Sequence, residues 1–171
     1  MIKKTSLLIT IAVISLIVYY YWPEPPLPTN SKITRLVVYK SKRELQVLAG
    51  SEILKTYKIS LGHHPVGDKQ KEGDGRTPEG FYTINDKNPN SGYHLNLGIS
   101  YPTAEQRKKA KAQGLNPGGD IKIHGLKNGQ GYIGKFQRWR DWTNGCMALT
   151  NAEVKELYDH VPIGTPIEIL P

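Results

Sequence analysis

The chain has 171 residues, which is enough for one ordinary domain and a short terminal extension. Lysine and arginine outnumber aspartate and glutamate by 23 to 15, and the resulting formal net charge of +8 favours anionic partners. The chain contains a single cysteine, so it cannot form an intramolecular disulfide and a disulfide-stapled scaffold is excluded.

Residues 1–22 predict an N-terminal transmembrane helix. The run Leu7–Trp22 is apolar apart from Thr10 and Ser15, and at about 1.5 Å per residue it spans roughly 24 Å, a little less than a hydrocarbon core of about 30 Å. Bulky aromatic residues end the run where a signal peptide would need a small-residue cleavage site, which favours an uncleaved anchor. Two lysines precede the helix, so the rest of the chain is expected outside the cytoplasm, on the periplasmic side of the inner membrane.

Residues 23–31 predict a proline-rich linker. The sequence Pro23-Glu24-Pro25-Pro26-Leu27-Pro28 favours a stiff, extended conformation. We expect it to act as a spacer that lifts the following domain, residues 32–171, off the membrane surface.

The domain predicts a β-rich α+β fold. Alternating and β-branched runs separated by turn sequences indicate a meander of short strands in its first half. Strands are predicted at Ile33–Tyr39, Glu44–Ala49, Glu52–Ser60, Gly80–Ile84, Ile121–His124 and Pro166–Leu170. Loops rich in glycine and asparagine are predicted at Gly114–Gly119 and Asn128–Gly134.

Two edge helices are predicted from capping boxes. Thr103 is followed three residues later by Gln106, and Thr150 is followed by Glu153 at the same spacing. In this motif each side chain bonds the backbone N–H of the other residue, which starts a helix.

The basic residues do not indicate nucleic-acid binding. They are scattered, apart from Arg107-Lys108-Lys109 and Lys111, and a solvated helix face explains that cluster. No recognition helix, zinc finger or ribonucleoprotein motif is visible. No nucleotide, haem or flavin signature is visible either, so no cofactor is predicted.

Cys146 is the candidate nucleophile. A cysteine thiol has a pKa of about 8.5, so a nearby base or oriented dipoles must activate it at neutral pH. His124 is the candidate base, because it ends the apolar alternation Ile121–His124 and a rigid strand would hold its imidazole. Gly145 leaves the backbone unencumbered, so nearby N–H groups can point at a developing oxyanion.

Two roles other than catalysis would also explain the Cys146 thiol. Cys146 could be a small buried apolar residue beside Met147-Ala148-Leu149. It could also bind a metal with His124 and one of His63, His64 or His94. The only short spacing is the adjacent pair of His63 and His64, which cannot easily converge on one ion, so no metal site is predicted.

Three motifs resemble the YkuD-type L,D-transpeptidases. His124-Gly125, seventeen further residues and then Thr143-Asn144-Gly145-Cys146 are similar to the signature of that family. The block Arg76-Thr77-Pro78-Glu79-Gly80 resembles its Thr-Pro-x-Gly motif, and Gly164-Thr165-Pro166-Ile167 resembles its closing strand. The resemblance covers nearly all of Ile33–Pro171, with the motifs in the expected order.

Two positions depart from the pattern of the family. Asn144 stands where most members have a second histidine, and Ala148 stands where an arginine or asparagine usually follows. The context Asp-Trp-Thr-x-Gly-Cys is most similar to the YafK-like murein subgroup, some of whose members also lack that histidine. The resemblance therefore leaves the acyl acceptor open.

The resemblance implies a YkuD-type β-sandwich of mixed sheets with short edge helices. It implies cysteine-dependent acyl transfer on the tetrapeptide stems of peptidoglycan, in cross-linking or remodelling of the cell wall. Cys146 would be the nucleophile, His124 the general acid and base, and backbone N–H groups around Gly145 the oxyanion donors. The substrate-binding candidates are Arg76, Tyr93, His94, Trp142, Thr143 and Asn144.

Three outcomes remain open at this point. An amine on a neighbouring stem or on an envelope protein would make the reaction a transfer, whereas water would make the protein a carboxypeptidase or an amidase. A wall-binding module without catalysis is the third. Some of the candidate residues could also be structural, since Arg76 is near Asp74 and Glu79 in the sequence and can pair with them.

Overall fold

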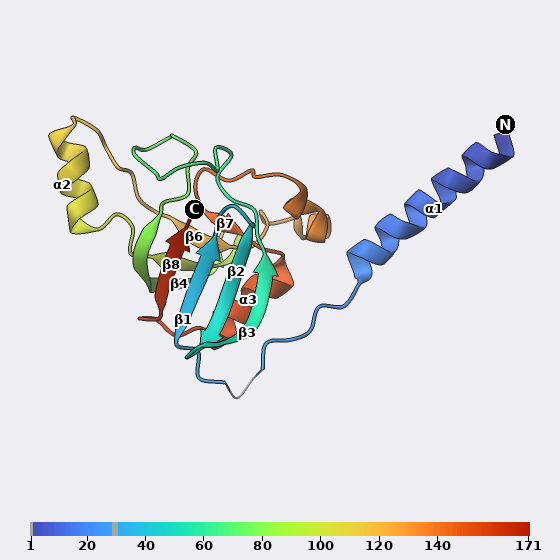
Figure 1. Cartoon of the computed structure of the whole chain (residues 1–171), viewed down its shortest axis with the longest axis horizontal. Helices are drawn as coiled ribbons and strands as arrows, with labels where there is room; N and C mark the ends of the chain where they lie inside the picture. The colour runs from blue at the N-terminus through green and yellow to red at the C-terminus, as the bar shows by residue number, and fades with distance from the viewer. Residues whose placement is uncertain (1, 29–30) are drawn as a thin grey trace.

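The N-terminal helix projects from a β-rich domain (Figure 1). The computed structural model describes residues 2–28 and 31–171. Helix α1 covers Ile2–Tyr21, and none of the stretch Lys4–Tyr21 is buried. Its mean hydropathy of 1.6 and its length suit a membrane span, although a signal sequence has the same properties.

The domain is built on one mixed sheet of eight strands in the order β3-β2-β1-β8-β4-β5-β6-β7. The strands are β1 (Arg35–Tyr39), β2 (Glu44–Ala49), β3 (Glu52–Lys58), β4 (Gly80–Ser91), β5 (His94–Ile99), β6 (Lys122–His124), β7 (Met147–Ala148) and β8 (Pro166–Leu170). The prediction of a β-rich α+β fold with mixed sheets is confirmed, and each of the six predicted strands is present.

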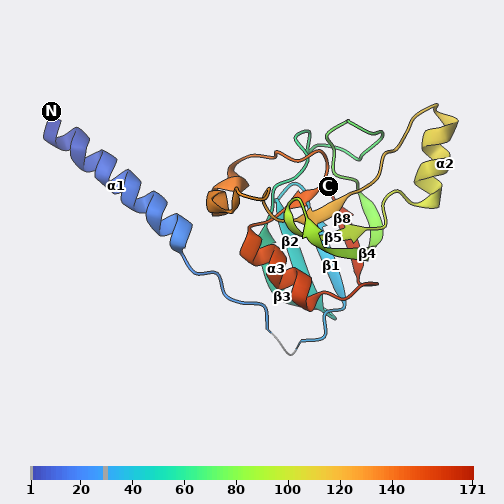
Figure 2. The same cartoon turned by 180° about the vertical axis from the view of Figure 1, so that it is seen from behind.

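Strand β4 joins the two halves of the sheet. Its first residues, Gly80–Thr83, pair with β8, and from Ile84 onward it pairs with β5. Irregular register between Ile84 and Asp86 bends the strand at this junction. The β1–β3 half and the β5–β6 half therefore lie on different sides of the core (Figures 1 and 2).

The two edges of the sheet are brought together near Cys146. Ser60, two residues beyond the end of β3, forms a bridge with Ala148 of β7. The N–H of Ser60 donates to the Ala148 carbonyl at 3.0 Å, and the N–H of Ala148 donates back at 2.8 Å. This pairing satisfies backbone groups that a free edge strand would leave open.

Both predicted capping boxes are confirmed, at the starts of α2 (Ala104–Ala112) and α3 (Asn151–His160). Helix α3 buries Val154 and Leu157 in the core and packs against β5. One expected loop is different: Asn128–Gly134 overlaps a 3₁₀ helix, η1, at Gly131–Trp139. Its aromatic residues, which follow the glycine-rich sequence, pack against α1.

The linker is not a free spacer over its described residues. Leu27 is 2 % exposed and belongs to the core cluster, and its N–H donates to the Glu156 carboxylate. Glu24 forms ion pairs with Lys135 and Arg138, each at 3.1 Å. An apolar side chain between prolines is buried, so this part of the linker runs along the domain. Residues 29 and 30 lie outside the described part of the chain.

Candidate active site

Cys146 and His124 line the same cavity, which has a volume of about 680 Å³. They reach it from neighbouring strands. Strands β6 and β7 pair in parallel, with Ile123 opposite Met147 and His124 opposite Ala148. Because Cys146 immediately precedes β7, backbone pairing fixes the position of the thiol relative to the imidazole.

The turn before Cys146 requires glycine at position 145. Gly145 has φ of +131°, and a Cβ atom there would lie 2.6 Å from the backbone oxygen of Arg76. The N–H of Gly145 donates to Thr143 Oγ1 at 3.1 Å, and that hydroxyl donates to the Cys146 carbonyl at 2.7 Å. The Gly145 N–H, which we expected to face an oxyanion, is thus already engaged.

The imidazole of His124 has a defined hydrogen-bonding state. Its Nδ1 lies 2.7 Å from the Gly125 carbonyl, which can only accept, so Nδ1 carries the proton and Nε2 of the neutral ring can accept one. The ring contacts both Tyr93 and Trp142, with centroid distances of 4.7 and 5.7 Å, and these two rings also contact each other at 6.1 Å. Burial lowers the pKa of His124 below its ordinary value, and the Lys122 charge acts in the same direction.

The surroundings of the Cys146 thiol favour its neutral form. It donates to the Asp120 carbonyl at 3.7 Å, and burial raises its pKa. The backbone N–H of Lys122 opposes this effect but does not reverse it. The shifts of His124 and Cys146 together favour a neutral thiol beside a neutral imidazole over a thiolate–imidazolium pair.

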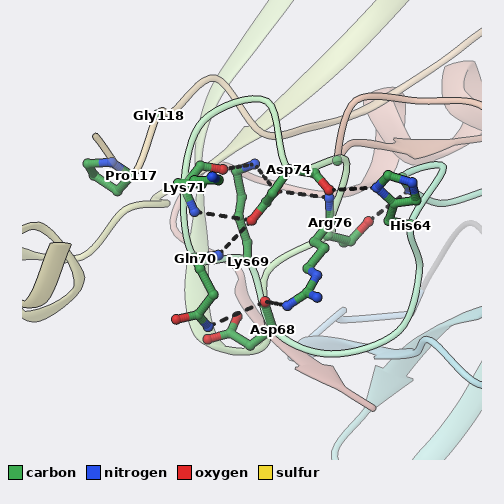
Figure 3. Close-up of polar contacts among 12 residues, drawn as sticks. His64, Asp68, Lys69, Gln70, Lys71, Asp74, Arg76, Pro117 and Gly118 are labelled. Atoms are coloured by element: carbon green, nitrogen blue, oxygen red, sulfur yellow. Dashed lines mark hydrogen bonds and ion pairs between the residues drawn. The ribbon is translucent and has the colours of Figure 1, made fainter. Parts of the chain in front are cut away.

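Four of the six substrate-binding candidates line the cavity: Tyr93, Trp142, Thr143 and Asn144. Arg76 and His94 lie outside it. The Arg76 guanidinium donates to the Asp68 carbonyl at 3.3 Å (Figure 3). His94 follows the turn residue Tyr93 and begins β5 with a φ of +66°, and it is not among the residues that line the cavity.

A loop held together by a buried ion pair forms one rim of the cavity. Lys69, whose side chain is 3 % exposed, pairs with Asp74 at 2.8 Å. Asp74 also accepts the backbone N–H groups of Gln70, Lys71 and Arg76 (Figure 3). Burial raises the pKa of Asp74, but the ion pair and these N–H donors outweigh it and lower that pKa to about 2.

Several cavity residues were missed in the sequence, among them Lys69, Lys122 and Asn96. Lys69 belongs to the Gly67-Asp68-Lys69 sequence just before the Thr-Pro block, which was the available signal. Asn96 is 2 % exposed, faces His124 in the β5–β6 register, and has a buried Oδ1 without a hydrogen-bond partner. A polar atom of this kind suits a ligand donor.

Within residues 2–28 and 31–171, no group of three or more His, Cys, Asp or Glu side chains is arranged to hold a metal ion. His63 instead engages the turn that carries the thiol. Its Nδ1 donates to the Thr143 carbonyl at 3.0 Å.

Comparisons with known proteins agree on one family. Residues 33–169 match the YkuD model, described as the L,D-transpeptidase catalytic domain. The "Putative L,D-transpeptidase YafK" of Escherichia coli (strain K12) is 31% identical over 131 residues, which cover 72% of this chain and 45% of that protein. The "Putative L,D-transpeptidase YqjB" of Bacillus subtilis (strain 168) is 28% identical over 153 residues, which cover 86% of this chain and 77% of that protein.

A solved structure shows the same fold. The helical cell shape determining protein Pgp2 from Campylobacter jejuni superposes with a TM-score of 0.60 at 25% identity, covering 82% of this chain and 48% of that one. The chain therefore spans about half the length of YafK and of Pgp2.

Proposed function

The chain belongs to the YkuD family of L,D-transpeptidase catalytic domains, and we propose that it catalyses cysteine-dependent acyl transfer on the tetrapeptide stems of peptidoglycan. The observation that carries this proposal is that Cys146, immediately before β7, and His124, in the neighbouring β6, line one cavity, with Nε2 of the imidazole able to accept a proton. The process served would be cross-linking or remodelling of the cell wall.

In the proposed first step, Nε2 of His124 takes the proton from Cys146 Sγ as the sulfur attacks the carbonyl carbon of the third stem residue. The tetrahedral intermediate then breaks its C–N bond. The imidazolium returns the proton to the departing amine, so D-alanine leaves as a neutral amine and the enzyme keeps a thioester. No metal or cofactor takes part in this sequence.

The neutral resting pair supports proton transfer during the attack. A buried thiolate would be costly without a cation beside it, whereas a neutral thiol and a neutral imidazole can both stay desolvated. Negative charge would then develop on the substrate carbonyl oxygen as the sulfur attacks. Oriented hydrogen-bond donors stabilise that charge most strongly at this step.

In this proposal Gly145 does not supply the oxyanion donor that we expected from it. Its N–H is engaged by Thr143, so the remaining candidates are the N–H of Cys146 and the carboxamide of Asn144, which lines the cavity. Asn144 occupies the position of the second histidine usual in the family. Its amide can donate without a change of protonation.

The lining of the cavity suits a peptide that carries both amide and carboxylate groups. Asn96 Oδ1 can accept an N–H of the stem, and the ammonium groups of Lys69 and Lys122 supply positive charge for its carboxylates. Arg76, the expected carboxylate clamp, points away. We therefore propose Lys122 in its place, because it lines the cavity and its ammonium, paired at 2.7 Å with the exposed Asp120, remains accessible to a substrate carboxylate.

Either an amine or water can resolve the thioester. An amine of another stem, or of an envelope protein, would yield a cross-link or an anchored protein. Water would yield carboxypeptidase or amidase activity. We propose transfer as the main outcome and place the domain outside the cytoplasm, with α1 anchored in the inner membrane.

The test is mass spectrometry of a disaccharide-tetrapeptide incubated with the full chain, with and without an amine acceptor. Transfer predicts loss of D-alanine and a new amide to the acceptor, whereas hydrolysis predicts only a tripeptide product. Cys146→Ala should abolish both products, and Cys146→Ser should retain binding with little turnover. Val66→Ala, at a residue that is 82 % exposed, is the matched control.

Unchanged product formation by Cys146→Ala would refute the cysteine mechanism. Sedimentation with purified sacculi by both wild type and Cys146→Ala, with no product from either, would identify a wall-binding module. Loss of activity on addition of a chelator would point to a metal-dependent hydrolase. A carbapenem adduct on the intact protein that depends on Cys146 would support the acyl-enzyme.

A further inference from the structure

The end of α1 packs against η1 through aromatic rings. Tyr19 lies 6.0 Å from Phe136 and 6.1 Å from Trp139, measured between ring centroids. Tyr20 lies 5.3 Å from Phe136, and its hydroxyl donates to the Tyr132 carbonyl at 2.8 Å. In both cartoon views η1 is the part of the domain beside the end of α1 (Figures 1 and 2).

This contact sets the level of η1 relative to a bilayer. Tyrosine and tryptophan concentrate at the membrane–water interface, so Tyr19–Trp22 mark the interfacial end of α1. Side chains of η1 that touch Tyr19 lie at the same depth. Two of its aromatic residues are largely exposed, Tyr132 at 75 % and Trp139 at 63 %. Exposed to water, these two rings contribute little to stability, whereas at the membrane–water interface their burial would anchor the domain.

A basic groove of about 550 Å³ runs beside Trp139 and Tyr19. One acidic and five basic side chains line it: Asp141, Lys42, Arg43, Lys58, Arg138 and Arg140. Three of the basic groups are already paired, since Arg43 bonds Asp141, Lys58 bonds Glu44 and Arg138 bonds Glu24.

Lys42 and Arg140 supply the unpaired charge in this groove. Both are exposed, and neither forms an ion pair with a carboxylate in the part of the chain that the structure describes. A phosphate group in the groove would meet these two cations, while an attached acyl chain could follow Trp139 and Tyr19 into the hydrocarbon.

We propose that η1 and this groove form a docking surface for anionic phospholipid in the membrane leaflet from which α1 emerges. The inference rests on the proposed anchoring by α1 and is independent of the cysteine chemistry. The occupant follows from the combination of exposed interfacial aromatics, unpaired cations and direct contact with a membrane helix. With Glu24 and Leu27 also fixed on the domain, such docking would hold the domain flat against the bilayer.

The experiment uses the full chain in phosphatidylcholine vesicles, prepared with or without phosphatidylglycerol and with lipid brominated on its acyl chains. Resistance to alkaline extraction first establishes whether α1 is inserted, so failure of anchoring is distinguished from failure of docking. Bromine should quench a part of the tryptophan fluorescence that Trp139→Phe lacks. That part should increase with phosphatidylglycerol.

Charge variants test the groove. Lys42→Ala with Arg140→Ala should remove the dependence on phosphatidylglycerol, whereas Lys108→Ala with Lys109→Ala on α2, away from η1, should leave it intact. Equal quenching of wild type and Trp139→Phe in every inserted sample would overturn the proposal. Protection of Trp139 from aqueous acrylamide without quenching by bromine would overturn it as well, in favour of a second copy of the chain.

Discussion

The Thr143 hydroxyl joins the N–H of Gly145 to the carbonyl of Cys146, accepting at 3.1 Å and donating at 2.7 Å. Thr143 is 4 % exposed, so both groups depend on this hydroxyl and not on water. The shape of the turn that presents the thiol is therefore determined by one side-chain oxygen.

Thr143→Val is expected to lower turnover about 10- to 100-fold, because it leaves two buried backbone groups unpaired and lets the thiol shift. Thr143→Ser keeps the hydroxyl and should retain most activity. The measurement is kcat/KM on a disaccharide-tetrapeptide. Equal activity of the valine and serine variants would show that the hydroxyl bridge does not position Cys146.

The pH dependence of thiol alkylation is expected to reflect burial. Burial raises the pKa of Cys146, so its reaction with iodoacetamide should reach half its maximal rate above the ordinary thiol pKa of about 8.5. The chain has only one cysteine, so the modified site is unambiguous. The urea-unfolded chain provides the unshifted reference. Rapid alkylation near pH 5 would instead indicate a thiolate–imidazolium pair.

Asp74→Asn is expected to reduce stability at neutral pH by roughly 2 kcal/mol. The folded pKa of Asp74, about 2, lies below its ordinary value of 3.8, so its contribution is present above pH 4 and is lost as pH falls through 2. The difference in unfolding free energy between wild type and variant should shrink across that window. Asp159→Asn removes an exposed ion pair with Lys155 on α3 and should change stability at pH 7 by less than about 0.5 kcal/mol. Denaturant titrations at pH 7, 4 and 2.5 measure both.

Leu27→Ala is expected to cost about 2–5 kcal/mol of unfolding free energy, as for other buried leucines. A free linker would instead tolerate this change. Val66→Ala removes apolar carbons from an exposed site and should alter stability by less than about 0.5 kcal/mol. Denaturant unfolding of the full chain in detergent distinguishes the two. Equal stability of the two variants would mean that Leu27 is not part of the core in solution.

Much of the fold could be predicted from local sequence patterns. β1 is a short β-branched apolar run, β2 begins with alternating polar and apolar residues, and both capping boxes depend on contacts three residues apart. The second half of β4 was missed because Asn88–Ser91 contains residues typical of turns. Their extended conformation depends on pairing with β5, which is a long-range contact.

The candidate site could be predicted from the sequence only where the residue type itself indicates a reactive group. A single cysteine and a histidine in a family-like spacing indicated the pair that we propose to react. Burial of Lys69 depends on Asp74, and the importance of Asn96 depends on a strand that the sequence did not reveal. Arg76 was expected in the cavity because of its charge, but its guanidinium is satisfied by the Asp68 carbonyl.

The pairing of Ser60 with Ala148 has a consequence for exchange of amide protons with solvent. The strand after Cys146 is bonded on one side to β6 and on the other to the segment that follows β3. Opening it requires the two halves of the sheet to separate, so its amides should exchange at rates close to those set by global unfolding. The rim loop at 69–73 lacks strand pairing and can open alone.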